Sequence, residues 1–167
     1  FGGQGILFTG KFLAYKGLLA DKNVSWLPSY GPEMRGGTAS CSVIISDEEV
    51  GSPIISQPDV LIAMNLPSFE KFEPTVKAGG IIIADSSLIE AKSTRTDIDV
   101  YYIPATALAS DMGKQSLANM IILGKLLKVM NDFNEDEIKT VLGKVIPPKK
   151  ADMLDINLKA MQLGFEN

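Results

Sequence analysis

Hydrophobic and polar positions along the chain follow two periods, one helical and one typical of strands. From Ile6 to about Asp21 the pattern is helical, and Gly10, Ala14 and Gly17 fall on one face. Because glycine costs a helix interior about 1 kcal/mol relative to alanine, two glycines on this face indicate close packing against a sheet. The segment Asn23–Gly37 is rich in glycine and proline and is expected to be a loop.

Short apolar runs predict four strands in the middle of the chain. They cover Ala39–Ser46, Asp59–Met64, Ile81–Ala84, which ends at Asp85, and Val100–Ile103. A turn is expected at Asp47–Glu49, because adjacent carboxylates repel one another unless they are solvated. A short helix is expected from Ser68 to about Glu73, where Pro74 should stop or kink it.

The C-terminal third is predicted to be helical. The segment Gln115–Met130 is apolar almost all round, which indicates burial on several sides. Asn134 followed by Glu137 is typical of a helix N-terminus. The apolar face expected after this cap consists of Ile138, Val141, Leu142 and Val145, and a last helix is marked by Leu154, Leu158 and Met161.

Strands that alternate with helices predict the α/β class, as a three-layer α/β/α sandwich with a mostly parallel or mixed central sheet. The strand Ala39–Ser46 follows a loop instead of a crossover helix, so it could run antiparallel. We expect one domain over residues 1–167. A glycine turn before a helix usually follows a strand, so an N-terminal strand is expected to be missing before Phe1.

Composition excludes several classes of function. The net charge of −4 argues against nucleic acid as the main partner. With one cysteine, Cys41, and no histidine, the chain has no internal disulfide, no cysteine-ligated iron–sulfur cluster, no Ser–His or Cys–His pair and no expected zinc site. Cys41 lies in an apolar run and is expected to be a buried small residue. No apolar run reaches the roughly 18 residues that span a bilayer, and we expect a cytoplasmic protein without membrane contact.

The chain opens on a glycine cluster, Gly2-Gly3-Gln4-Gly5, directly before the first predicted helix. Such a cluster lets backbone N–H groups approach an anion closely. A dinucleotide fingerprint does not fit, because its third small residue would be Phe8 and no acidic residue follows a second strand at the required distance. The remaining interpretations are contact with another phosphate-bearing ligand, such as CoA, or a tight turn used for packing or subunit contact.

A second loop, Tyr30–Gly37, is the stronger functional candidate. It combines Tyr30, Met34 and Arg35, and these residue types are enriched at interfaces. Long glycine-rich loops also often carry binding sites. The alternative is an ordinary surface loop with a weak Glu33–Arg35 ion pair. The predicted interface residues are Tyr30, Glu33, Met34, Arg35, Gly36 and Gly37.

Polar residues at strand ends are further candidates, because ligands gather at the carboxyl ends of parallel strands. Asn65 follows one strand, and Asp85-Ser86-Ser87 follows another. Their structural alternative is capping of the next helix or turn. Asn119, inside an apolar helix, is either a satisfied buried amide or part of a site lining.

The ordered series GGQG (2–5) and YGPEMRGG (30–37) resembles the gamma subunit of the 2-oxoacid:ferredoxin (acceptor) oxidoreductases. The similarity continues through Gln57–Ala63, Ile103–Thr106, Ala118–Gly124 and Asn157–Phe165. That family decarboxylates 2-oxoacids such as pyruvate or 2-oxoglutarate oxidatively to acyl-CoA, and its gamma fold is a three-layer α/β/α domain. The resemblance implies partner alpha and beta subunits, with a ferredoxin-like delta subunit in some complexes, and ferredoxin as electron acceptor.

The resemblance also places thiamine diphosphate, Mg²⁺ and [4Fe-4S] clusters on partner subunits, so no catalytic residue and no metal ligand is expected here. On this interpretation Gly2, Gly3, Gln4, Gly5, Arg35 and Asn119 are candidates for CoA contact or an interface. Two alternatives stay open: the small subunit of indolepyruvate oxidoreductase, and a purely structural subunit without a ligand.

Overall fold

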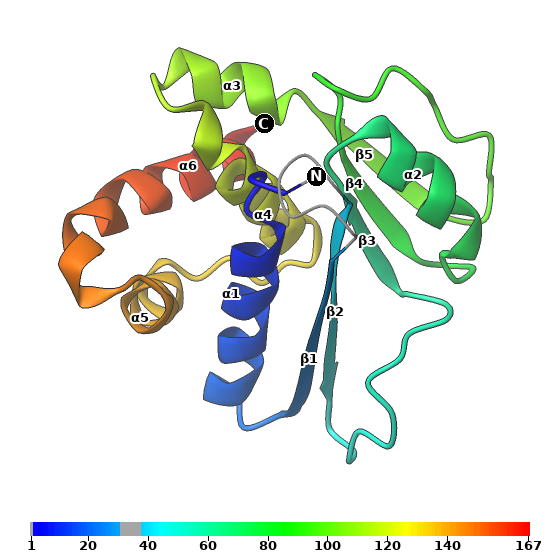
Figure 1. Cartoon of the computed structure of the whole chain (residues 1–167), viewed down its shortest axis with the longest axis horizontal. Coiled ribbons are helices and arrows are strands. Elements are labelled where there is room, and N and C mark those ends of the chain that lie inside the picture. The colour runs from blue at the N-terminus through cyan, green and yellow to red at the C-terminus, as the bar shows by residue number, and fades with distance from the viewer. Residues whose placement is uncertain (1, 31–37) are drawn as a thin grey trace. The chain divides into compact units, whose positions relative to one another are not determined.

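The computed structural model describes residues 2–30 and 38–167 (Figure 1). The elements are α1 (Ile6–Leu19), β1 (Asn23–Tyr30), β2 (Ala39–Ser46), β3 (Val60–Ala63), α2 (Leu66–Phe72), η1 (Glu73–Thr75), β4 (Ile81–Asp85), β5 (Asp99–Ile103), α3 (Ala105–Asp111), η2 (Gln115–Leu117), α4 (Ala118–Val129), α5 (Glu135–Val145), η3 (Pro148–Met153) and α6 (Leu154–Glu166). They fall into two compact units, residues 1–55 with 132–159 and residues 56–131 with 160–167. The α/β class predicted from the sequence is confirmed.

The first unit contains an antiparallel two-stranded sheet. β1 pairs with β2 from Asn23 opposite Ser46 to Tyr30 opposite Ala39. The antiparallel direction considered for β2 is therefore confirmed, but the loop expected from residue 23 onwards is wrong over its first eight residues. Pro28 misled the sequence analysis, because proline breaks a central strand but is tolerated in a strand that pairs on one side. Among the described residues, β1 pairs only with β2.

Helix α1 packs closely against this sheet, as its small face predicts (Figure 1). A Cβ atom added at Gly17 would lie 2.8 Å from a methyl group of Val24 and 3.0 Å from one of Ile45. A Cβ atom at Gly10 would collide with the thiol of Cys41. Real Cβ atoms do not approach their neighbours so closely, so both glycines are required by the distance between helix and sheet.

The second unit is built on a parallel sheet in the order β3-β4-β5. Its buried residues include Ala63, Ile82 and Ala84, which pack with Phe69 of α2. The described strands thus form two separate sheets, one antiparallel and one parallel. Gly124 of α4 and Gly164 of α6 meet the backbone of the opposite helix in this unit.

Local signals located the C-terminal helices well. Asn134 caps α5, and its side-chain oxygen accepts a hydrogen bond from the Glu137 amide at 3.0 Å. All four residues of the predicted apolar face of α5 are buried. Helix α4 is buried over most of its surface, and α6 begins at Leu154 as expected. Helix α3, by contrast, was not predicted.

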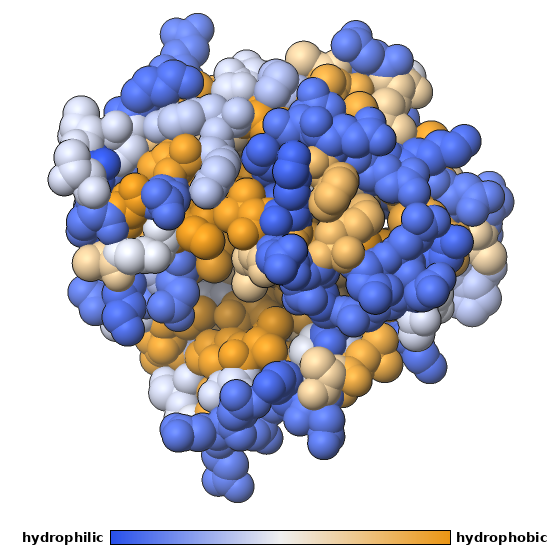
Figure 2. Space-filling model, turned by 180° about the vertical axis from the view of Figure 1, so that it is seen from behind, coloured by the Kyte–Doolittle hydropathy of each residue, from blue (hydrophilic) through white to orange (hydrophobic). Residues whose placement is uncertain are grey.

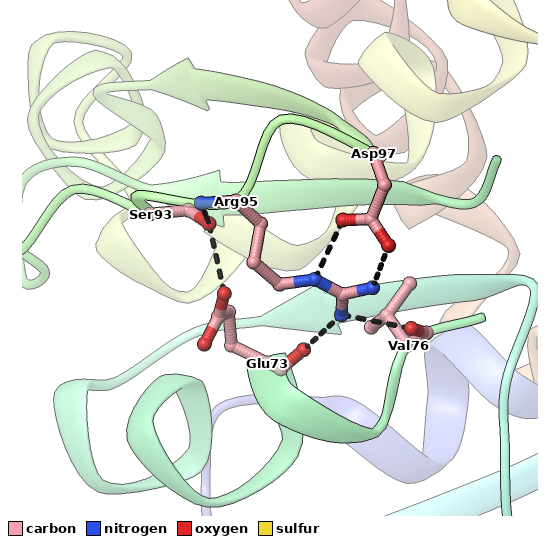
Figure 3. Close-up of polar contacts among 5 residues, drawn as sticks. All are labelled: Glu73, Val76, Ser93, Arg95 and Asp97. Carbon is pink, nitrogen blue, oxygen red and sulfur yellow. Dashed lines mark hydrogen bonds and ion pairs between the residues drawn. The ribbon is translucent and has the colours of Figure 1, made fainter. Parts of the chain in front are cut away.

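A guanidinium clamp holds the loop that precedes β5 (Figure 3). Arg95 donates two hydrogen bonds to the carboxylate of Asp97, at 2.9 and 2.7 Å, and one each to the carbonyls of Glu73 and Val76. The pKa of Asp97 is lowered mainly by its hydrogen bond from Arg95. Because every partner of this arginine is a protein group of the same unit, we interpret the clamp as structural.

Apolar residues also reach the surface of the chain, as Figure 2 shows on one face. They include Leu18, Leu19, Trp26, Leu27, Tyr30, Ile45, Ile54, Leu88, Met130 and Phe165. Within residues 2–30 and 38–167, no helix combines the length and the hydropathy needed to cross a membrane.

A buried lysine links α1 to α5 and its preceding turn. The Lys16 ammonium lies 2.6 Å from Asp132 and 2.5 Å from Glu137. Burial lowers the pKa of Lys16, but hydrogen bonds to the two carboxylates outweigh this and raise the pKa above its ordinary value of 10.5.

The raised pKa predicts how alkaline pH acts on stability. A raised pKa contributes stability that is complete below the unfolded-state pKa and lost as pH rises through the folded-state pKa. We therefore expect the free energy of unfolding to fall above about pH 10.4, the unperturbed lysine value. Lys16→Met should be less stable at neutral pH and should show a smaller alkaline loss in urea titrations. An equal alkaline loss in both proteins would contradict this assignment.

Candidate functional site

The glycine cluster at the start of the chain forms a left-handed turn. Gly3 has φ +90° and Gly5 has φ +74°, a region that L-residues with a side chain rarely adopt. Gly3 is exposed, and a Cβ atom added there would find no heavy atom of the described residues within 4 Å. Among the described residues, nothing blocks the approach of a group to Gly3, and its positive φ angle favours glycine.

This turn leads directly into α1. Gly5 is the N-cap residue, the helix has no side-chain cap, and its first turn holds no acidic residue. Thr9 fastens the turn from within, because its amide and its hydroxyl both donate to the Gly5 carbonyl at 3.0 Å. Backbone N–H groups at a helix N-terminus favour an anion such as phosphate, and the first turn of α1 brings no carboxylate of its own.

The turn and the end of β1 lie at the same end of the first unit. Along α1, Gly17 faces Val24 and Gly10 faces Trp26, so the helix and β1 run in opposite directions. The N-terminus of α1 is therefore beside the C-terminal half of β1, which ends at the exposed Tyr30. Of the predicted interface residues, Glu33, Met34, Arg35, Gly36 and Gly37 lie outside the described residues.

Cys41 and Trp26 meet beneath α1, a pair that sequence analysis did not connect. Burial raises the pKa of the Cys41 thiol, and a hydrogen bond from the Trp26 side chain partly offsets that rise. Cys41 is half-buried, so the prediction of a buried small residue is only partly met. The raised pKa keeps it a protonated, weakly nucleophilic thiol. The alternation of residues around Trp26 could have predicted a strand, but Pro28 favoured a loop prediction instead.

The polar residues at the strand ends cap the following helix or turn, as their hydrogen bonds show. Asn65 caps α2 by accepting from the Ser68 amide at 2.9 Å. The fully buried Asp85 accepts from the amides of Ser87 and Thr106, at 3.1 and 3.3 Å. Its second oxygen accepts from the Thr106 hydroxyl at 2.5 Å. These groups thus hold the start of α3 against the end of β4.

Ser86 and Ser87 also make hydrogen bonds within the fold, and Asn119 is buried. The Ser87 hydroxyl accepts from the Ala107 amide at 3.1 Å, and the Ser86 amide bonds the Ile103 carbonyl at 2.9 Å. Asn119 is buried at the start of α4 in the second unit, whereas the glycine turn belongs to the first. Among the described residues, no group of three or more His, Cys, Asp or Glu side chains is placed to hold a metal ion.

The fold and this turn define an α/β protein with an anion-compatible glycine turn before its first helix. A family model described as pyruvate ferredoxin/flavodoxin oxidoreductase matches residues 1–167. The chain belongs to this family, which confirms the resemblance inferred from the GGQG and YGPEMRGG segments.

Curated relatives occur in two lengths. Ketoisovalerate oxidoreductase subunit VorA of Methanothermobacter marburgensis is 37% identical over 167 residues, which cover 99% of this chain and 34% of VorA. 2-Oxoglutarate synthase subunit KorC of Methanocaldococcus jannaschii is 35% identical over 170 residues, covering 99% of this chain and 89% of KorC. The chain therefore spans about a third of VorA but nearly all of KorC.

Solved structures agree with this assignment. The gamma subunit of a keto/oxoacid ferredoxin oxidoreductase from Geobacter sulfurreducens has a TM-score of 0.78 and 30% identity, over 99% of this chain and 92% of that one. A 2-oxoglutarate:ferredoxin oxidoreductase from Magnetococcus marinus has a TM-score of 0.83 and 28% identity, over 98% of this chain and 28% of that one. The latter structure contains 2-oxoglutarate, coenzyme A and succinyl-CoA.

Proposed function

We propose that this chain is the gamma-type module of a 2-oxoacid:ferredoxin oxidoreductase and that its glycine turn helps to position CoA. The likeness to a CoA-bound oxidoreductase carries this proposal, together with the exposed, left-handed backbone at Gly3. Relatives named for 2-oxoglutarate and ketoisovalerate support 2-oxoacids as the substrate class. The single domain expected over residues 1–167 is part of the proposal, since the family model runs through both compact units.

In the proposed reaction a 2-oxoacid loses CO₂, its acyl carbon gives up two electrons to ferredoxin, and the CoA thiol forms the thioester. Thiamine diphosphate with Mg²⁺ supplies the carbanion chemistry and [4Fe-4S] clusters carry the electrons, all on partner polypeptides. With one cysteine and no histidine, this chain does not provide the ligands of such a cluster. Its own task is to bind CoA phosphate through backbone N–H groups near Gly3, Gln4 and Gly5, with Arg35 as a candidate cation.

Two alternatives make different predictions. Indolepyruvate oxidoreductase subunit IorB of Archaeoglobus fulgidus is a more distant relative, 25% identical over 185 residues, so the indolepyruvate alternative has weaker support. A purely structural subunit would assemble normally but would not respond to changes in the glycine turn. The CoA dependence of the assembled enzyme separates this alternative from the proposal.

Gly3→Ala tests the proposed CoA contact with little effect on packing. The added methyl group meets no atom of residues 2–30 and 38–167 within 4 Å, so its cost to the described fold is mainly the strained backbone. We expect the KM for CoA in the assembled enzyme to rise about tenfold, which corresponds to about 1.4 kcal/mol. The KM for the oxoacid should change little.

Gly113→Ala is the matched control for this variant. Gly113 has φ +85°, is exposed and also has no neighbour within 4 Å, but it follows α3 in the second unit. Both substitutions should therefore cost a similar amount of stability, whereas only Gly3→Ala should weaken CoA. Equal KM values for CoA in the two variants would overturn the proposed contact.

A further inference from the structure

Helix α1 buries two polar side chains, Thr9 and Lys16. Lys16 is paired with two carboxylates, whereas the Thr9 hydroxyl donates to the Gly5 carbonyl at 3.0 Å. The Thr9 amide donates to the same oxygen, also at 3.0 Å. Thr9 is only 4% exposed, and a valine of similar shape would fill this position without burying a polar group. Packing alone therefore does not explain the hydroxyl.

The carbonyl that receives both hydrogen bonds belongs to a glycine. Gly5 has φ +74° and ψ +23°, and a residue without a Cβ atom resists rotation about these bonds only weakly. Because the peptide bond is planar and trans, the orientation of the Gly5 carbonyl also sets the orientation of the Ile6 N–H group. The carbonyl is directed along α1 toward Thr9, so the Ile6 N–H group points the opposite way, toward the glycine turn.

This N–H group is one that an anion at the turn would use. The first four N–H groups of a helix have no acceptor within the helix, and Ile6 is the first residue of α1. A second hydrogen bond on the Gly5 carbonyl restricts tilting of the peptide plane and polarises it, which strengthens the N–H group as a donor.

We propose that Thr9 is a positioning residue, whose hydroxyl orients the Ile6 N–H group toward a phosphate group of CoA. The two hydrogen bonds to the Gly5 carbonyl carry this inference, because they fix the peptide plane that contains this donor. The inference rests on the proposed function, since it takes CoA as the ligand of the glycine turn.

Helix α5 contains the same type of hydrogen bond in a different setting. The Thr140 hydroxyl donates to the Asp136 carbonyl, four residues earlier, at 3.0 Å. The N-terminus of α5 is capped by the Asn134 side chain and has three acidic residues in its first turn, so it disfavours an anion. Helix α1 has neither feature. The bond from Thr9 therefore acts on a turn that can receive an anion, whereas the bond from Thr140 does not.

Removing the hydroxyl tests this role in the assembled complex, purified through a tag on the native chain. Thr9→Val keeps the approximate shape of the side chain and the amide hydrogen bond to Gly5, so stability in urea titration should change little. We expect the Kd of CoA, measured by calorimetry without oxoacid, and the KM for CoA to rise about fivefold, the ratio for one net hydrogen bond. The effect should appear in the KM for CoA and not in the KM for the oxoacid.

Two further variants separate positioning from a general effect on a helix. Thr9→Ser retains the hydroxyl and should bind CoA like the native chain. Thr140→Val is the matched control, because it removes the same type of hydrogen bond from an exposed position in the same unit, and it should leave the Kd of CoA unchanged. An equal rise in both valine variants, or no rescue by Thr9→Ser, would overturn the positioning role.

Comparison with Gly3→Ala separates this inference from the proposed function. A raised KM for CoA in Gly3→Ala together with a native value in Thr9→Val would overturn only the role of Thr9. Native CoA binding in both variants would overturn the CoA contact of the turn and this inference together. Weaker CoA binding in both, with native binding in Thr9→Ser and Thr140→Val, is the result that we expect.

Discussion

Replacing Gly164 by alanine should be one of the two most destabilising methyl additions at the described glycines. A Cβ atom at this position of α6 would overlap the carbonyl oxygen of Ile121 in α4 and would lie 3.0 Å from the amide nitrogen of Lys125. Backbone atoms cannot rotate away as a side chain can, so the two helices must separate. Overpacking a tight core costs about 1–3 kcal/mol, and we expect a loss at or above about 3 kcal/mol here because backbone is displaced. The free energy of unfolding in urea measures the effect.

Gly143→Ala controls for the helix preference of alanine. Gly143 lies inside α5, and an added Cβ atom there would meet nothing within 4 Å. Alanine should therefore stabilise this helix by about 0.5–1 kcal/mol. Gly124→Ala should resemble Gly164→Ala, because its Cβ atom would overlap the carbonyl of Met161. If Gly164→Ala were as stable as Gly143→Ala, the close approach of α4 and α6 would be wrong.

Asp85→Ala is the second substitution for which we expect a large effect. It removes the acceptor for the Ser87 amide, the Thr106 amide and the Thr106 hydroxyl at a fully buried position. An unsatisfied buried donor costs about 1–3 kcal/mol, so we expect a total loss of about 3 kcal/mol in urea titration. Amide hydrogen exchange should rise first at the start of α3, because this carboxylate holds it.

Asp85→Asn and Thr106→Val separate geometry from charge. The asparagine keeps an oxygen that can accept the two amide hydrogen bonds, so its loss should be well below that of alanine. Thr106→Val removes only the hydroxyl contact and should cost about 1 kcal/mol. Equal stability of the alanine variant and the native protein would show that Asp85 does not hold α3.

Local signals were sufficient where an element depends on its own residues. Asn134 and Glu137 located the start of α5, and the apolar run Ile81–Ala84 located β4. The glycine face of α1 also predicted close packing correctly, because a face of Gly10, Ala14 and Gly17 has few other physical explanations.

Elements held by distant residues could not be predicted in this way. Helix α3 has no side-chain cap of its own. Its first amides bond to Asp85 and Ser87, about twenty residues earlier. No local sequence pattern therefore predicts α3. β1 contains a proline and mixed polarity, and its strand conformation depends on pairing with β2 and packing under α1.

In the candidate site, too, local features were predictable from the sequence and features that depend on distant residues were not. The sequence predicted a glycine cluster that lets the backbone approach an anion, and the positive φ angles of Gly3 and Gly5 were found only in the structure. The resemblance grouped the glycine cluster with Arg35 of the loop Tyr30–Gly37, but no local pattern predicted that the turn lies beside the end of β1, because that proximity depends on the antiparallel packing of α1 and β1. Trp26 was missed for the same reason.

The central claim is that this chain works in CoA-dependent oxidation of a 2-oxoacid. The most direct measurement uses the complex purified through a tag on the native chain and follows viologen dye reduction with and without CoA and oxoacid. We predict reduction that requires both 2-oxoacid and CoA, with acyl-CoA formed in proportion to the dye reduced. A complex that reduces the dye equally well without CoA, or forms no acyl-CoA, would contradict the account.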